Sequence, residues 1–352
     1  MKLHNGLACV CWLKHLAEEC QAASLFGSDY EPVVSTARLY DLNEATLDFY
    51  AESPLLGPPG IDLSVSYPAG FFLEHRLIDG HPLAAAGDFI EAYGKLVAEH
   101  FPKALNDAVA YLEGDTSQGH PNDLAIFLTV KEDAAFTLLP KLLDLQGMSD
   151  RAGGTIEKLR KIKHLLTMNQ LGFMNSREGR PVRLNLMPVN EKLDDIIEGL
   201  RILGCRTLLE QCEEILREID KLGIMNYVLG IDVLADGSIG DTFGIEMGPK
   251  ELLPTQHRRL FQSEKYRRFI ELLQSYRIAD ERVLAIPLCS WNRNFHVELS
   301  GGFFETHVYS FPSHFKLKWN KEGPMPAKIY LSMRTMDRQN VINETIPQRG
   351  LY

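Results

Sequence analysis

The sequence lacks long apolar segments. The apolar stretch at residues 7–13 ends after seven residues, and Lys14, His15 and Glu18 follow it at once. A signal peptide needs a small-residue cleavage site after its apolar region, and a membrane-spanning helix needs about 20 apolar residues. We therefore read the start of the chain as an amphipathic helix and expect a cytoplasmic protein with no membrane partner.

Cysteine is also scarce. The chain has six cysteines among 352 residues, namely Cys9, Cys11, Cys20, Cys205, Cys212 and Cys289. They are too scattered for a disulfide framework, and most lie in apolar or helix-like stretches, where a free cysteine behaves as a small hydrophobic residue. This usage is typical of a reducing compartment.

An excess of positive charge is missing as well. Lysine and arginine number 37 against 47 acidic residues, which gives a formal net charge of −10. General nucleic-acid binding needs a basic face that displaces phosphate counterions, so we expect no nucleic-acid partner. Hydrophobic residues make up 45% and charged residues 24% of the chain, as in ordinary globular proteins that bury a full core.

Familiar catalytic motifs are absent too. The chain has no glycine-rich phosphate loop, no Gly-x-Ser-x-Gly, no His-Glu-x-x-His and no Cys-x-x-Cys. This lowers the odds of catalysis without excluding it. We expect no cofactor and a binding protein rather than an enzyme.

The pattern of apolar residues and chain breakers predicts an α+β protein with antiparallel sheets. Helices are expected over residues 7–26, 44–51, 84–100, 102–113, 134–146, 155–170, 191–203, 205–221, 256–276 and 280–284. Asn43 and Asn190 are expected to cap two of these helices. Strands are expected over 38–42, 61–78, 124–130, 173–186 (a hairpin), 227–233 with 243–247, 295–299, 307–311, 315–319 and 328–333.

The length suits two units, which we place at 1–150 and 151–340, with a mobile tail at 341–352. Short sequences recur in the same order in both units: Arg-Leu, then Asn-Glu, then Gly-Ile-Asp, which stands at 60–62 and at 230–232. A duplication that produced two related halves would explain this recurrence. Chance would explain it as well, because the spacings differ between the two units.

Acidic and imidazole side chains raise two hypotheses about chemistry. His296 and Glu298 share one face of a strand, as Glu305 and His307 do, with His314 nearby, and such groups on facing strands can hold a metal ion. Solvent-facing polar residues on a half-exposed sheet give the same pattern, so we expect no metal. Asp232, Asp236, Asp241 and Glu246 bracket a hairpin, where paired carboxylates can exchange protons, although Asp-Gly is also an ordinary turn.

Basic residues form two islands in this acidic chain. Arg177 and Arg183 are an even number of residues apart in the 173–186 hairpin, and His314, Lys316 and Lys318 share one face of a later strand. Such islands can bind a carboxylate, a phosphate or an acidic peptide, and lysines on edge strands also discourage aggregation. We take these five residues as the candidate binding site.

Three stretches together carry a family resemblance: residues 171–185, 230–246 and 313–331. Their order and spacing resemble proteins encoded beside peptide precursors in clusters for ribosomally synthesised and post-translationally modified peptides. The peptide-binding proteins of crocagin biosynthesis are the named example. The resemblance implies a protein that binds a precursor peptide, with a maturation enzyme as a further partner, and that takes part in the maturation of a peptide natural product.

Two alternatives stay open. One is an enzyme that modifies a peptide or small molecule, metal-assisted through the His296 to His314 set. The other is a prenyltransferase of antiparallel strands with outer helices, because residues 328–331 (Lys-Ile-Tyr-Leu) resemble the last strand of such barrels. Those enzymes hold a diphosphate with basic residues inside the barrel. We count too few regular strands to prefer it.

Overall fold

The structure is a computed structural model. It describes residues 5–18, 23–27, 48–68, 109–114, 125–129, 139–141, 143–144, 147–148, 151–174, 177, 179, 181–250, 259–299 and 302–336. The expected elements at 38–42 and 84–100, and the tail at 341–352, lie outside these residues.

Twelve strands form one antiparallel sheet. They are β1 (Asp48–Pro54), β2 (Asp62–Pro68), β3 (Val109–Gly114), β4 (Ala125–Thr129), β5 (Leu166–Met174), β6 (Val182–Pro188), β7 (Met225–Val233), β8 (Ile239–Pro249), β9 (Trp291–Leu299), β10 (Gly302–Asn320), β11 (Gly323–Pro324) and β12 (Lys328–Met336). The helices are α1 (Asn5–Glu18), α2 (Ala23–Phe26), α7 (Gly153–Ile162), α8 (Leu193–Leu203), α9 (Arg206–Asp220), α11 (Glu264–Ser275) and the 3-10 helix η3 (Glu281–Cys289). The α+β class with antiparallel pairing is therefore confirmed.

The sheet closes on itself. Each strand from β1 to β8 pairs with the next, β1 also pairs with β12, β12 pairs with β10, and β10 pairs with β8. Strand β10 is 19 residues long, so it can pair with both β12 and β8. Among the described strands, β9 and β11 pair only with β10 and stand outside this ring. Both expected units, 1–150 and 151–340, contribute strands to it.

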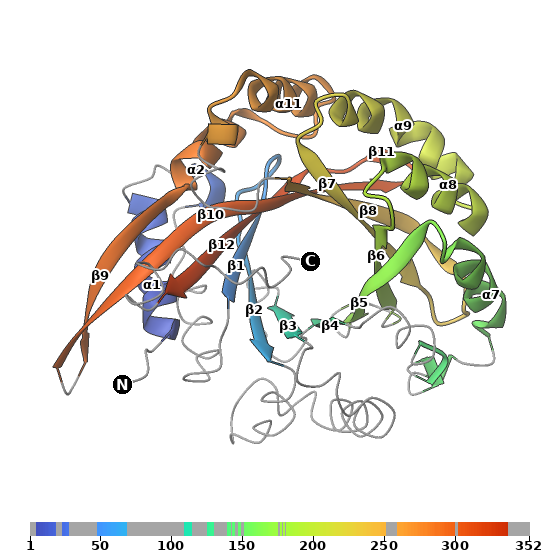
Figure 1. Cartoon of the computed structure of the whole chain (residues 1–352), viewed down its shortest axis with the longest axis horizontal. Helices are drawn as coiled ribbons and strands as arrows, with labels where there is room; N and C mark the ends of the chain where they lie inside the picture. The colour runs from blue at the N-terminus through green and yellow to red at the C-terminus, as the bar shows by residue number, and fades with distance from the viewer. Residues whose placement is uncertain are drawn as a thin grey trace.

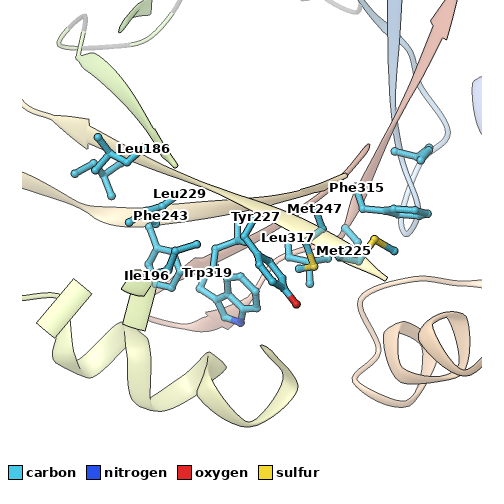
Figure 2. Packing of buried hydrophobic residues seen from close by; sticks show 14 of the residues in the cluster. Leu186, Ile196, Met225, Tyr227, Leu229, Phe243, Met247, Phe315, Leu317 and Trp319 are labelled. Carbon is cyan, nitrogen blue, oxygen red and sulfur yellow. The ribbon is translucent and has the colours of Figure 1, made fainter. Parts of the chain in front are cut away.

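The helices lie on the outside of the curled sheet (Figure 1), and buried apolar residues of strands and helices form one core cluster. Phe315, Leu317 and Trp319 alternate along β10 and are fully or almost fully buried. The Trp319 ring stacks on Phe243 of β8 with centroids 5.4 Å apart. Figure 2 shows these side chains between the strands and the helices, with Ile196 of α8 among them. Burying each such side chain stabilises the fold by roughly 1.5–3 kcal/mol.

The outer helices follow their apolar periodicity. In α8, Leu193, Ile196, Ile197, Leu200 and Leu203 are buried at three- and four-residue spacing. The helix ends at Gly204, whose φ of 93° is left-handed and suits glycine. The predicted helices at 191–203 and 205–221 are thus confirmed. The predicted Asn190 cap is wrong, because the helix begins after Lys192 and the Asn190 side chain bonds to Asp195 instead.

Three predicted helices are wrong where the structure has strands. The helix expected over 44–51 overlaps β1, that over 102–113 overlaps β3, and that over 155–170 stops at Ile162, before β5. Closing the sheet gives these segments hydrogen-bonding neighbours on both sides, which outweighs their local helix propensity. The separate strands expected at 307–311 and 315–319 are one strand, β10, with an irregularity at Pro312.

No helix in the described ranges has both the length and the apolar character needed to span a membrane.

Candidate functional site

The inner face of the closed sheet, turned away from the helices, carries the polar residues that alternate with the outer apolar ones. Tyr330 on β12 influences the pKa of Arg183 on β6, and Glu52 on β1 influences that of Lys318 on β10. These strands are not neighbours in the sheet, so their side chains meet across the inside. The closed sheet therefore gathers charged groups from most of the chain onto one surface, which we call the inner face.

Arg183 forms a buried two-pronged ion pair. Its Nε and Nη2 each donate to a carboxylate oxygen of Asp232 on the adjacent strand, both at 2.8 Å. Burial disfavours a charged guanidinium, but Asp232 reverses this effect and raises the pKa of Arg183. Arg177 lies 3.4 Å from the same carboxylate. The Asp232 carboxylate on β7 thus contacts two guanidinium groups, that of Arg183 on β6 and that of Arg177, which precedes β6.

Lys316 joins β8, β10 and β12. Its Nζ donates to Glu246 at 2.8 Å and to the Tyr330 hydroxyl at 3.5 Å. The His314 ring stacks on Tyr330 with centroids 4.1 Å apart and lies 3.9 Å from Glu246. Burial lowers the pKa of His314, so this ring is neutral at pH 7. Burial and the nearby carboxylate of Glu52 raise the pKa of Tyr330 well above its ordinary value, so its hydroxyl keeps its proton.

Glu52 is a carboxylate buried to 3% exposure and paired with Lys328. Burial alone would raise the pKa of Glu52, but Lys328, with Lys316 and Lys318, lowers it to about 2. Its Oε2 atom is buried without a hydrogen-bond partner in the described part of the chain. A charged oxygen left unpaired in this way is a place where a ligand or a water can donate a hydrogen bond.

Lys318 differs from the other inner-face cations. Arg183, Lys316 and Lys328 each pair with a carboxylate, whereas Lys318 has no ion pair or hydrogen bond with any described residue. Burial, and then the like charges of Lys316 and Arg183, lower the pKa of Lys318 to about 7. This side chain is therefore only partly protonated near pH 7, and a bound anion would favour its ammonium form.

Two glycines let these side chains lie close to the sheet backbone. Gly244 faces Lys318 across the β8–β10 pair and Gly230 across the β7–β8 pair. A Cβ at Gly244 would touch both Lys316 Cε and Lys318 Cγ at 3.5 Å, and a Cβ at Gly230 would lie 3.2 Å from Asn185 Oδ1. That Asn185 oxygen is also buried without a partner in the described ranges. The Lys316 and Lys318 side chains therefore lie directly against the backbone of Gly244.

A small apolar patch completes the inner face. Ala125, Phe127 and Met174 form a cluster apart from the outer core. The Phe127 ring lies over Gly172, where a Cβ would come within 2.5 Å of it and within 3.2 Å of Arg183 Cβ. The ring and Arg183 thus flank the same glycine, so an apolar surface adjoins the charged one.

The structure brings the five predicted binding residues together. Arg177, Arg183, His314, Lys316 and Lys318 were chosen from two distant islands, and all lie at the inner face or its edge. Among the hypothetical acid/base groups, Asp232 and Glu246 also lie there. Asp236 instead bonds to Ser238 in an exposed turn, and Asp241 is exposed.

Sequence reasoning missed Glu52, Tyr330 and Asn185. The signal for Glu52 was the alternation of Phe49 and Ala51 with Tyr50 and Glu52, which a strand requires and which the expected helix over 44–51 concealed. Tyr330 and Asn185 lay within strands that were expected, but nothing in the sequence showed that those strands face one another.

The hypothetical metal ligands stand on β9 and β10. The register places Glu305 opposite His296 and His307 opposite Asn294, on one face of the hairpin. The side chains of His296, Glu298 and Glu305 lie outside the described ones, and the His307 ring contacts Asn294. In the described part of the chain no three His, Cys, Asp or Glu side chains are grouped to hold a metal. The expectation of no metal at these four candidate residues stays a prediction.

Comparison with known proteins gives a likeness in structure alone. No family model and no curated protein matches the sequence. The crystal structure of the prenyltransferase PriB in its apo form matches with a TM-score of 0.54 and 15% identity, over 95% of this chain and 96% of that one. The structure of AnaPT from Neosartorya fischeri has a TM-score of 0.49 and 9% identity, over 93% and 91% of the two chains.

The likeness to PriB shows a shared fold along nearly the whole chain: helices around a strongly curled antiparallel sheet. It contradicts the identification with peptide-binding proteins of the crocagin type and the peptide-maturation function that followed from it. The expectation of a protein without catalysis is wrong on the same ground. The precursor peptide and its maturation enzyme were partners implied by that identification alone.

Proposed function

We propose that this chain is an enzyme similar to aromatic prenyltransferases, which transfers a prenyl group from a prenyl diphosphate to an aromatic acceptor at the inner face. The observation that carries the proposal is the closed antiparallel sheet, shared along 95% of the chain with a prenyltransferase, with cations gathered on its inner side. The polar inner face fits this reading, because a structural core would place apolar residues there.

The diphosphate is the first substrate group to place. Its negative charge suits Lys318, which lacks a carboxylate partner in the described ranges, and the adjoining Lys316 and Arg183. Lys316 and Arg183 are held by Glu246 and Asp232, so they are positioned before the substrate arrives.

Transfer begins when the bond between C1 of the prenyl group and oxygen breaks, with its electron pair leaving on the diphosphate. Cations stabilise the charge that develops on that oxygen. The allylic cation then bonds to a carbon of the aromatic ring. Phe127, in the apolar patch, offers an aromatic ring that can stabilise the positive charge.

Glu52 is suited to bind the aromatic acceptor. Its unpaired Oε2 can accept a hydrogen bond from an N–H or O–H of the aromatic ring system and orient that ring. After the new bond forms, the ring carbon must lose its proton. The protonated ring is a strong acid, so even a carboxylate with a pKa of about 2 can take that proton and restore the aromatic system.

The test is a prenylation assay with purified protein, dimethylallyl or geranyl diphosphate, and a panel of indole and phenol acceptors, with products detected by mass spectrometry. We expect an acceptor to gain one prenyl group. Lys316→Gln should lower kcat/KM by about 100-fold, because a charge-assisted contact to the leaving group is lost. Glu52→Gln should lower it similarly, because a neutral amide cannot take the proton.

Lys161→Gln is the matched control, since Lys161 lies on the exposed side of α7 with 62% of its side chain accessible. It should retain full activity. Circular dichroism shows whether each variant is folded. Release of free prenyl alcohol without acceptor product would support donor binding while contradicting transfer. Absence of both product and donor binding would contradict the proposed function.

The cytoplasmic location and the two related halves stay predictions. The second Gly-Ile-Asp lies within β7, whereas the first precedes and enters β2. Comparing the two halves as separate superposed structures would test their relation.

A further inference from the structure

Lys318 occupies a place where a permanent cation is unfavourable. It lies on the inner face of β10, two residues from Lys316 and opposite Gly244, which offers no side chain to balance its charge. The neighbouring carboxylates are already engaged: Glu246 with Lys316, Asp232 with Arg183, and Glu52 with Lys328. The geometry thus leaves one amine near three cations and with no carboxylate of its own.

The charged and titratable groups around Lys318 come from each strand that faces it. Lys316 and His314 share β10, Glu246 lies on β8, Arg183 on β6, Glu52 on β1, and Lys328 with Tyr330 on β12. Arg183 and Lys328 keep raised pKa values, while Glu52 and Glu246 keep lowered ones. Burial lowers the pKa of His314 and raises that of Tyr330. Lys318, with a pKa of about 7, therefore loses its charge as the pH rises above neutral.

We propose that capture of the donor diphosphate is coupled to uptake of one proton by Lys318, so that this residue acts as a proton-dependent latch for the anion. The proposal rests on the proposed function and specifies how its donor site is regulated. In the free protein the amine is largely neutral above pH 7. When the diphosphate binds beside it, the anion supplies the missing partner and the amine becomes an ammonium ion.

The direction of the pH effect follows from linkage. Below pH 7 the amine is already protonated, so binding takes up little additional proton. Above pH 7 each binding event must also remove a proton from solution, which weakens apparent affinity by up to tenfold per pH unit. Alkyl phosphates lose their last proton near pH 6, so the ligand itself keeps a constant charge above pH 7.5.

The experiment is isothermal titration calorimetry of the full chain with dimethylallyl S-thiolodiphosphate, an analogue that resists ionisation. Titrations at pH 8 in HEPES and in Tris give the number of protons taken up, because these buffers differ in ionisation enthalpy. We expect an uptake of about 0.9 proton at pH 8 and a rise in Kd of roughly 20-fold between pH 7.5 and 9.

Two variants assign the proton. Lys318→Arg keeps a permanent positive charge, so it should bind with no proton uptake and with a Kd that is independent of pH in this range. Lys318→Met should bind at least tenfold more weakly at pH 7.5, also without uptake, and it covers the case in which the arginine does not fit. Lys161→Met, on exposed α7, should behave as the unmodified protein does.

The possible results distinguish the proton-coupled binding at Lys318 from the proposed prenyl transfer. Binding without proton uptake would overturn the latch while leaving the proposed function intact. Uptake that persists in Lys318→Arg and Lys318→Met would assign the proton to another group and also overturn it. No binding of the analogue at any pH would overturn both the latch and the donor site of the proposed enzyme.

Discussion

The ion pair of Glu52 and Lys328 illustrates how a single buried residue connects stability and function. Glu52 is 3% exposed, whereas the Lys328 side chain keeps 28% of its surface in solvent. Removing one member of a buried pair leaves the other charge without compensation. This destabilises a protein more than replacing both members with apolar residues does. The fixed geometry of such a pair can therefore hold a carboxylate in place for a substrate.

We expect Glu52→Gln to lower the free energy of unfolding by roughly 3 kcal/mol at pH 7, because Lys328 then keeps only the weaker attraction of Asp62, at 3.8 Å, and of Glu113 among the described residues. The lowered pKa of Glu52 contributes stability that is present above pH 4.5 and is lost as the pH falls toward 2. The difference between variant and unmodified protein should thus shrink at pH 3. Urea unfolding at both pH values measures it.

The double variant Glu52→Gln/Lys328→Met is the control. It removes both charges, so it should lose less stability than the two single changes added together. Strict additivity would mean that the two side chains do not interact.

At the scale of elements, the turn between β7 and β8 is held against the start of α7. The Thr155 hydroxyl donates to the Gly237 carbonyl at 2.7 Å. Gly237 has a φ of 79°, and a Cβ there would lie 2.3 Å from the Arg151 carbonyl group. This contact joins a hairpin of the closed sheet to an outer helix that precedes it by about 80 residues of chain.

Gly237→Ala should therefore destabilise the protein by more than its backbone conformation alone requires. Gly57 is a matched control, with a φ of 85° and no atom within 4 Å of the Cβ that an alanine would add. We expect Gly57→Ala to cost about 1 kcal/mol, as left-handed backbone does for an L-residue. Gly237→Ala should cost roughly 2 kcal/mol more, from overpacking. Equal losses in chemical denaturation would show that the turn does not press on α7.

Element types were predictable where the periodicity was strong and local. The amphipathic helices α8 and α9 and the pair β7–β8 were predicted, because their buried residues recur at three to four or at two positions. The first part of β5, residues 166–170, was not, because it was assigned to the helix expected over 155–170. Only its pairing with β4 and β6 decides between a helix and a strand.

At the scale of the whole molecule, closure of the sheet links distant parts of the chain. Strand β1 near the start pairs with β12 near the end, and β8 pairs with β10. Trp12 of α1 donates to the Ser310 hydroxyl of β10 at 2.8 Å, across 298 residues of sequence. A closed sheet offers no free edge in its ring from which strands can peel away one by one.

We expect the described core to unfold in one cooperative step. Far-ultraviolet circular dichroism, which follows the strands and helices, and tryptophan fluorescence, which follows Trp12, Trp291 and Trp319, should give the same urea midpoint. Trp12→Phe removes the hydrogen bond to Ser310 and should lower that midpoint while keeping the two probes coincident. Separate midpoints would show that the regions on either side of residue 150 unfold independently.

The sequence by itself determined the α+β class, the antiparallel pairing and the two cationic islands, because these depend on residue types at short, regular spacing. The tertiary structure alone decided that the sheet closes and that both islands face its interior, together with Glu52 and Tyr330. The physical reason is that closure is contact between strands far apart in the sequence, such as β1 with β12 and β8 with β10, and no local pattern records which strands those are. The proposed function depends on this closure, because the sheet encloses an interior only when β8 pairs with β10.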